Sequence, residues 1–364
     1  MRKSVFAMLV LVLSNLLASC SNIKQINHTT FVTAIGVDKS EKGVRVYALS
    51  AIPGRFGALS SSGGGGDKNP NYILQASGRD IGEALFEMKR KNSKDLNFGQ
   101  CQIILFSEEI SKQGLNPYLD VFMRREQFRI TSWIAITKGS PDKVLQLQPK
   151  VTESSSDYLV NMFSQAGSDT YEVLPIYLYE FFSYASEPDK TPYAMYIIPD
   201  PKEAGLQQAE LALFNEDKLV GKLTSRETAM LQMLQNRKLK PTTITTSKRS
   251  YQLLEQHTKT TFRSNKLFIS TKMKAEITDA SNQSHFSESQ LKEAEEDLSD
   301  YMEKQLTSLL DSMQSMHVDP VGYGGKYRLY TKSSFERKTW LDNVFPKMPF
   351  TVKVTVELRQ ATRY

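Results

Sequence analysis

Apolar and polar residues alternate in several stretches of the chain, and this pattern predicts strands. Residues 350–359 (FTVKVTVELR) place an apolar side chain at every second position, and residues 266–278 do the same over thirteen positions. A period of two puts the apolar side chains on one face of a strand. We therefore expect two half-buried strands that pair in one sheet. Nearer the start, residues 31–38 and 44–52 are strand-like runs separated by KSEKG, which predicts a β-hairpin.

Other stretches repeat apolar residues with a helical period behind capping residues. Ser287 and Gln290 have the spacing of a capping box, and a helical pattern of about thirty residues follows them. Its apolar stripe either packs on the sheet of its own domain or binds a partner, and the pattern leaves both open. Residues 152–186 predict one more helix. The stripe consists of Leu291, Ala294, Leu298, Tyr301, Leu309, Met313 and Met316. Further helix starts are expected at Asp80, Ser107, Asn116, Ser140 and Thr224.

Strands and helices are mixed along the chain in a way that predicts an α+β fold. We expect two to three subdomains, each with a mainly antiparallel or mixed sheet packed against helices, and one long helix in the C-terminal domain. A length of 364 residues agrees with two to three subdomains. A proline-rich stretch at 186–206 predicts the boundary. The N-terminal region then covers residues 31–200, with room for two subdomains and a Gly-rich loop at 53–70, and the C-terminal domain covers 206–364.

The first thirty residues predict export and a lipid anchor. Two basic residues precede an apolar run over residues 5–17, which is too short to span a bilayer and has the features of a signal peptide. The run ends in Leu-Ala-Ser-Cys at Cys20, which resembles a bacterial lipobox. We expect residues 1–19 to be a signal peptide, Cys20 to carry a diacylglyceryl group, and residues 20–30 to tether the chain to the extracytoplasmic face of a membrane. An ordinary secretory signal with an incidental cysteine is the alternative.

The net charge and the number of cysteines argue against some kinds of partner and against a disulfide bond. The formal net charge of +6 is mild for 364 residues, and no RNP, helix-turn-helix or zinc-knuckle pattern occurs, so no nucleic-acid partner is expected. Cys101 is the second of two cysteines and lies in the strand-like run QCQIILF. Buried thiols usually act as small apolar groups, so we expect Cys101 in the core. With Cys20 lipidated, no intramolecular disulfide can form.

The sequence offers no catalytic, cofactor or metal site. None of the four histidines has a second ligand at a metal-binding spacing, and neither GxSxG nor HExxH occurs. The glycine run at 63–66 lacks the following Lys-Ser/Thr of a phosphate-binding loop, and strands flank it on both sides. We therefore expect a protein that is not an enzyme and has no cofactor. The segment 56–71 is expected to be a disordered loop, with partner contact as the alternative.

Four segments carry a resemblance to a known family. They are SCSNIKQINHTTFVTAIGVDKSEKG (19–43), GLNPYLDVFMRREQFRITSWIAITKGSPDKVL (114–145), AELALFNEDKLVGKLTSRETAMLQML (209–234) and YGGKYRLYTKSSFERKTWLDNVFPKMPFTVKVTVELRQATR (323–363). In this order they resemble the Ger(x)C proteins, the lipoprotein C subunits of GerA-type spore germinant receptors. The chain departs from the family at Ser21, where an aromatic residue is usual, and at Gln100, where histidine is frequent. If those positions touch a sister subunit, the contacts of this receptor differ.

The resemblance implies a non-catalytic subunit that works with an A and a B subunit in the spore inner membrane. Within the second segment, Arg124, Glu126 and Arg129 match the arginine-rich helix-to-strand part of the family, so they are candidates for partner contact. Their residue types alone fit either an anion site or a solvated helix end.

A solute-binding lipoprotein that captures a small nutrient is the alternative function. It is suggested by a cluster of aromatic residues that either lines a pocket or packs in a core. The cluster consists of Tyr171, Tyr177, Tyr179, Phe181, Phe182 and Tyr184.

Overall fold

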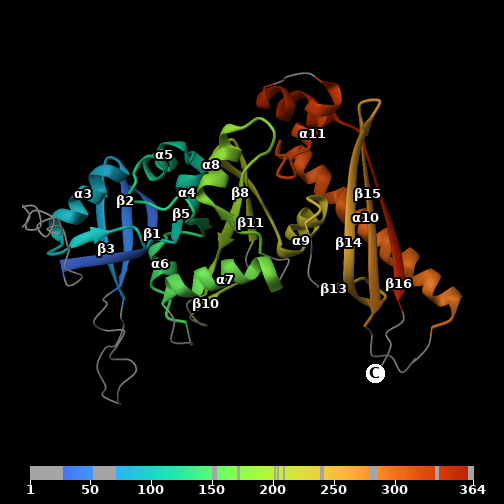
Figure 1. Cartoon of the computed structure of the whole chain (residues 1–364), viewed down its shortest axis with the longest axis horizontal. Helices are drawn as coiled ribbons and strands as arrows, with labels where there is room; N and C mark the ends of the chain where they lie inside the picture. Colours follow the sequence, from blue (N-terminus) through green and yellow to red (C-terminus); the bar gives the residue numbers. More distant parts are fainter. Residues whose placement is uncertain are drawn as a thin grey trace, which may run out of the picture.

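The computed structural model describes residues 28–51, 71–149, 154–169, 173–200, 202, 205–207, 210–237, 242–278, 286–332 and 336–359. Two sheets lie beside one another along the long axis of the molecule, each with helices packed against it (Figure 1). The predicted α+β fold with mixed sheets is confirmed. Cys20 and the Gly-rich loop at 53–70 lie outside the described residues.

Within the described residues, the larger sheet has ten strands in the order β12-β11-β8-β6-β5-β1-β2-β3, with β4 beside β1 and β7 beside β6. Neighbours among β1, β5, β6 and β8 are parallel, whereas the hairpins at both ends are antiparallel. All residues of β5 and β8 are buried, as expected for central strands covered on both faces. The strands are β1 (Thr29–Ser40), β2 (Gly43–Ala51), β3 (Asn71–Gly78), β4 (Asp95–Asn97), β5 (Ile103–Ser107), β6 (Trp133–Thr137), β7 (Ile176–Tyr177), β8 (Tyr193–Ile197), β11 (Glu210–Asn215) and β12 (Lys218–Leu223).

Six helices of the described N-terminal part surround this sheet; α3 packs on β2 and β3, and α4 reaches β12. A close approach of α6 to β1 requires Gly36, because a β-carbon there would lie 2.6 Å from the β-carbon of Pro141. The helices are α3 (Ile81–Lys91), α4 (Glu108–Gln113), α5 (Asn116–Arg124), α6 (Asp142–Leu145), α7 (Ser155–Asp169) and α8 (Leu178–Ser186).

Two details of the predicted helices are wrong. Residues 152–186 do not form one helix: α7 ends at Asp169, and β7 precedes α8. Pro175 has no N–H to donate and disfavours a helical residue before it, which explains the interruption. Asn116 is not the N-cap of α5, which is Leu115; the Asn116 N–H instead donates to Asp217 Oδ2 at 2.8 Å.

The smaller sheet has four strands in the order β13-β14-β15-β16 within the described residues. The predicted pairing of residues 266–278 with 350–359 is confirmed, and the two strands run parallel, from Leu267 beside Phe350 onward. The helices Ser225–Leu234 (α9) and Glu288–Ser315 (α10) begin at the expected capping boxes. The remaining elements are β9 (Pro199–Asp200), β10 (Gly205–Leu206), β13 (Thr242–Thr245), β14 (Ser250–Arg263), β15 (Lys266–Ile277), α11 (Tyr323–Thr331), a π-helical turn (Thr339–Val344), a 3-10 turn (Phe345–Lys347) and β16 (Phe350–Arg359).

Helix α10 runs along the smaller sheet (Figure 1). The apolar face of α10 packs there, so the predicted stripe serves its own domain rather than a partner. Of the predicted stripe, Leu291, Tyr301 and Met316 are only half buried. The buried residues of the helix are Ala294, Leu298, Met302, Leu306, Leu309, Leu310 and Met313.

The hairpin of β11 and β12 follows the expected boundary at 200–206 but belongs to the larger sheet, where β11 pairs with β8. Helix α9 then contacts β11 and β12 on one side and β14 and α10 on the other. The proline-rich stretch therefore does not separate the two sheets; the chain passes from one to the other through α9. How the chain divides into folding units stays a prediction.

Candidate partner-binding site

The three charged residues expected to contact a partner lie at the end of α5 and just beyond it. Arg124 is the last residue of α5, and its Nε donates to Asp120 Oδ1 at 2.6 Å. Glu126 is exposed and lines a hollow of 320 Å³ near β4. Arg129 is also exposed, and its carbonyl oxygen accepts hydrogen bonds from the N–H and hydroxyl of Ser132.

No hydrogen bond or ion pair joins the side chains of Arg124, Glu126 and Arg129 to one another within the described residues. All three residues are exposed, and in the part of the chain that the structure describes Arg124 alone has an ion pair, with Asp120 of its own helix. Contact with a partner through them stays a prediction.

Cys101 lies in the core, as predicted. Its side chain is fully buried, and its Sγ lies 3.4 Å from the carbonyl oxygen of Ile103. Burial raises the pKa of the thiol to about 12, because the charged form loses its hydration. The thiolate is the reactive form of cysteine, so Cys101 is a structural residue at neutral pH.

The aromatic residues that suggested a nutrient pocket are engaged in packing. Phe181 is buried and meets Phe214 of β11 edge to face, with ring centroids 4.9 Å apart. Tyr177 stacks on Trp133 with centroids 3.8 Å apart, and Tyr179 lies beside it. Tyr171 lies outside the described residues. Phe181 is therefore a core residue, whereas Tyr179 is exposed. Tyr177, Phe182 and Tyr184 are half-buried.

The described residues contain no group of three or more His, Cys, Asp or Glu side chains that could hold a metal ion. None of the helices in the described ranges is long and apolar enough to cross a membrane.

Polar contacts connect residues 184–193, which lie at and after the end of α8, to the C-terminal domain. These contacts were not predicted from the sequence. We call this set the clasp; it consists of residues 184–193 together with Asp319, Arg328, Arg337 and Trp340. The Arg337 guanidinium donates to the carbonyl oxygens of Tyr184, Ala185, Glu187 and Lys190. It therefore supplies donors to two carbonyls in the last turn of α8, those of Tyr184 and Ala185, and to two carbonyls of the segment that follows the helix.

Asp319 holds the second part of the clasp. Its backbone exchanges two hydrogen bonds with Thr191, and its carboxylate accepts from the N–H groups of Gly322 and Gly324 and from Trp340 Nε1 at 2.7 to 3.0 Å. The side chain is fully buried, and this burial raises the pKa of the carboxyl group, whereas the hydrogen bonds oppose the shift. Two residues more than 120 positions apart are fixed together in this way.

Lys190 completes the clasp, and no carboxylate among the residues that the structure describes forms an ion pair with it. Its Nζ lies 4.3 Å from the ring centroid of Tyr184 and 5.3 Å from that of Tyr193, which are cation–π distances. Burial and, secondarily, the nearby Arg237 charge lower the pKa of this ammonium to about 8. On the same segment, Asp189 forms an ion pair with Arg328 of α11.

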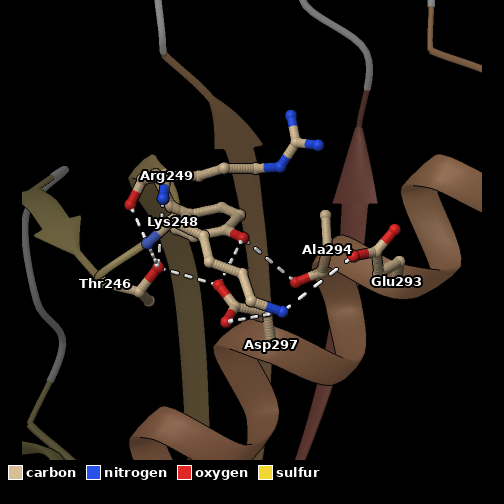
Figure 2. Close-up of polar contacts among 7 residues, drawn as sticks. Thr246, Lys248, Arg249, Glu293, Ala294 and Asp297 are labelled. Carbon is tan, nitrogen blue, oxygen red and sulfur yellow. Dashed lines mark hydrogen bonds and ion pairs between the residues drawn. The ribbon is translucent and has the colours of Figure 1, made fainter.

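A further polar network fixes the turn between β13 and β14 to α10 (Figure 2). Asp297 accepts a hydrogen bond from the Thr246 hydroxyl at 2.7 Å and another from the Tyr251 hydroxyl at 3.1 Å. The Lys248 Nζ lies 3.9 Å from both Asp297 and Glu293. Since Asp297 is only 13% exposed, its partners are internal and the network positions the helix.

Helix α10 also covers the outer edge of the smaller sheet. Glu303 accepts a hydrogen bond from the backbone N–H of Val354 at 2.8 Å, and Glu295 accepts one from Leu358 at 2.9 Å. The two glutamates are eight residues apart on the helix, and the two N–H groups are four residues apart on β16. Side chains thus occupy backbone donors that would otherwise be open to another strand.

Comparison with known proteins gives one consistent result over the whole chain. Residues 22–199 match the family described as spore germination protein N-terminal domain, and residues 209–362 match spore germination B3/GerAC like, C-terminal. The putative spore germination protein YfkR of Bacillus subtilis (strain 168) is 24% identical over 99% of this chain and 97% of its own length. Spore germination protein KC of the same organism is 24% identical over 99% of this chain and 96% of its own length.

Two further relatives agree with this result. Spore germination protein GerQC of Bacillus cereus is 22% identical over 97% of this chain and 98% of its own length. The crystal structure of the GerBC protein has the same fold, with a TM-score of 0.54 and 16% identity over 93% of this chain and 99% of that one. The chain therefore belongs to the Ger(x)C family of spore germination proteins, the C subunits of germinant receptors.

Proposed function

We propose that this chain is a non-catalytic, lipid-anchored subunit of a spore germinant receptor. A lipid on Cys20 holds it on the extracytoplasmic face of the spore inner membrane, where it assembles with the A and B subunits and supports nutrient-triggered germination. The observation that carries the proposal is the family match over residues 22–199 and 209–362, which begins directly behind the Leu-Ala-Ser-Cys sequence that ends at Cys20.

The arrangement of charges supports a role in assembly. Arg124, Glu126 and Arg129 lie exposed on one turn, whereas the aromatic cluster of the alternative solute-binding function packs against Phe214 and Trp133. No observation on the described residues favours nutrient capture by this chain alone.

The test replaces the lipid-bearing residue. Cys20→Ala should move the chain from the membrane fraction to the soluble fraction and impair germination by nutrients, and Ser19→Ala, which keeps a small residue before the cysteine, serves as the matched control. Co-purification of the tagged wild-type chain from spore membranes should recover the two sister subunits. Normal membrane retention of Cys20→Ala would contradict the anchor. Tight binding of amino acids or sugars to the purified chain in calorimetry would favour the solute-binding alternative instead.

A further inference from the structure

The outer edge of β3 differs from the other elements of the larger sheet in what surrounds it. Among the described strands, β3 pairs with β2 alone and ends the sheet. A hollow of 640 Å³ follows the second half of the strand, from Gln75 to Arg79, and continues onto α3 and the turn between β1 and β2. The strand edge therefore forms one side of a groove.

The groove reaches around the edge to both faces of the sheet. On one face, α3 lies so close to β3 that a β-carbon at Gly78 would be 2.5 Å from the Ala84 nitrogen. On the other face, Arg45 Nε donates to the Ser77 hydroxyl at 3.3 Å. A strand laid along this edge would direct alternate side chains towards the two faces, because side chains of a strand alternate.

More basic than acidic side chains line the groove. Glu83 pairs with Arg79 at 2.9 Å and Glu87 pairs with Arg90 at 2.7 Å, so both acidic residues of the lining are neutralised. Lys42, Arg45 and Lys91 also line the groove, and the described part of the chain gives them no ion pair. Three positive charges without a carboxylate partner surround a strand edge, and they come from β2, α3 and the turn.

We propose that the outer edge of β3 binds an extended, acidic segment of another polypeptide, which adds to the larger sheet as a further strand. Backbone hydrogen bonds to β3 supply the binding, and carboxylates of the segment pair with Lys42, Arg45 and Lys91 on the two sides of the edge. The inference deepens the proposed function, since it names the chemistry of a partner, and it rests on that proposal only for the idea that the chain works in an assembly.

The test measures binding of a synthetic peptide to the full-length chain in detergent. The probe is a fluorescein-labelled peptide of ten residues in which pairs of Glu alternate with pairs of Val, so that Glu side chains face both sides of the strand, and its counterpart has Lys in place of Glu. Fluorescence anisotropy should show saturable binding of the Glu peptide and binding of the Lys peptide that is about tenfold or more weaker. Hydrogen exchange should slow in residues 71–78 when the Glu peptide is added, and should not change in β16.

Two variants and one modified peptide separate strand addition from simple charge attraction. The charge reversal Lys42→Glu, Arg45→Glu and Lys91→Glu should weaken binding about tenfold, since three exposed pairs are lost. A matched reversal of exposed lysines in the smaller sheet, Lys259→Glu, Lys272→Glu and Lys353→Glu, should leave binding unchanged. A Glu peptide with an N-methyl group on every residue keeps its charge but loses the backbone donors of both its edges, so it should fail to bind.

Three results would overturn the proposal. The first is no binding of the Glu peptide at millimolar concentration. The second is equal binding of the N-methylated peptide, or displacement of the Glu peptide by inorganic phosphate, which would indicate an anion site rather than strand addition. The third is protection from exchange elsewhere than residues 71–78. All three leave the Cys20 test unaffected, so failure here is distinguishable from failure of the proposed function.

Discussion

The two sheets end in outer edges that the chain treats in opposite ways. At β16, carboxylates of α10 accept hydrogen bonds from the backbone of Val354 and Leu358, so the protein itself occupies these two donors of the edge. At β3, a groove follows the edge, and three cations around it have no ion pair within the described residues. Charged residues near a strand edge can thus either complete the fold or remain available to a second molecule. Which of these two roles a charged residue has depends on whether it lies within hydrogen-bond distance of the backbone donors of the edge.

The clasp belongs with β16 in this comparison, because the charges of Arg337 and Asp319 have internal partners. Arg337 donates to four carbonyl oxygens, and the Asp319 carboxylate accepts three hydrogen bonds. The comparison predicts that changing an internally matched charge lowers stability, whereas changing a cation at the β3 edge affects binding alone.

The largest effect is expected at the clasp. Arg337→Met leaves the carbonyl oxygens at the end of α8 without donors, so we expect the free energy of unfolding to fall by about 3 kcal/mol. Urea denaturation monitored by circular dichroism measures it. Lys338→Met changes an exposed neighbour and should cost less than about 0.5 kcal/mol. If both variants unfold at the same urea concentration, the clasp does not contribute to stability.

A smaller effect is expected at β16. The double variant Glu295→Ala and Glu303→Ala removes two hydrogen bonds to the strand edge, and each should cost about 1 kcal/mol because the bonds are only partly buried. The opened edge should also promote self-association, which analytical ultracentrifugation detects. Glu296→Ala with Asp300→Ala removes two exposed acidic residues of the same helix and is the control. A monomeric, fully stable edge variant would mean that β16 is closed by something other than these carboxylates.

The smallest effect concerns Lys190, a half-buried cation of the clasp that has no ion pair within the described ranges. Its pKa in the folded chain, about 8, lies below the ordinary value of 10.5, so the charged ammonium disfavours folding. Stability should therefore rise as the pH increases from 7 through 8 to 9, by roughly 1 kcal/mol. Lys190→Met should lack this gain. Thermal unfolding of both proteins at pH 7 and pH 9 measures the difference, and an equal response in both would refute a desolvated ammonium.

Local patterns were sufficient to predict the hairpin of β1 and β2, the capping boxes and the pairing of the last strand with residues 266–278, whereas β14 (Ser250–Arg263) was not predicted. Alternation and cap chemistry depend on neighbouring residues, so they are visible in the sequence. The break between α7 and α8 was missed, although Pro175 was a usable signal. The helical period of apolar residues over 152–186 continues on both sides of Pro175, so periodicity alone predicts one helix.

The clasp and the two edges could not be predicted, because their residues are far apart in the sequence. Arg337 and Tyr184 are 153 positions apart, and Leu358 and Glu295 are 63 apart. No spacing rule connects such positions before the topology of the sheets is known. The exposed charges Arg124, Glu126 and Arg129 were identified through resemblance alone, and their contact with a partner stays a prediction.

The hairpin of β11 and β12 has a consequence for the exchange of parts between relatives. The two family matches meet between residues 199 and 209, yet the strands that finish the first sheet come after that point. A chimera joined there would have to match the β8–β11 register and the contact of Phe181 with Phe214 from different parents. A junction behind Leu223 would transfer a complete sheet, so the unit that can recombine intact is longer than the first sequence match.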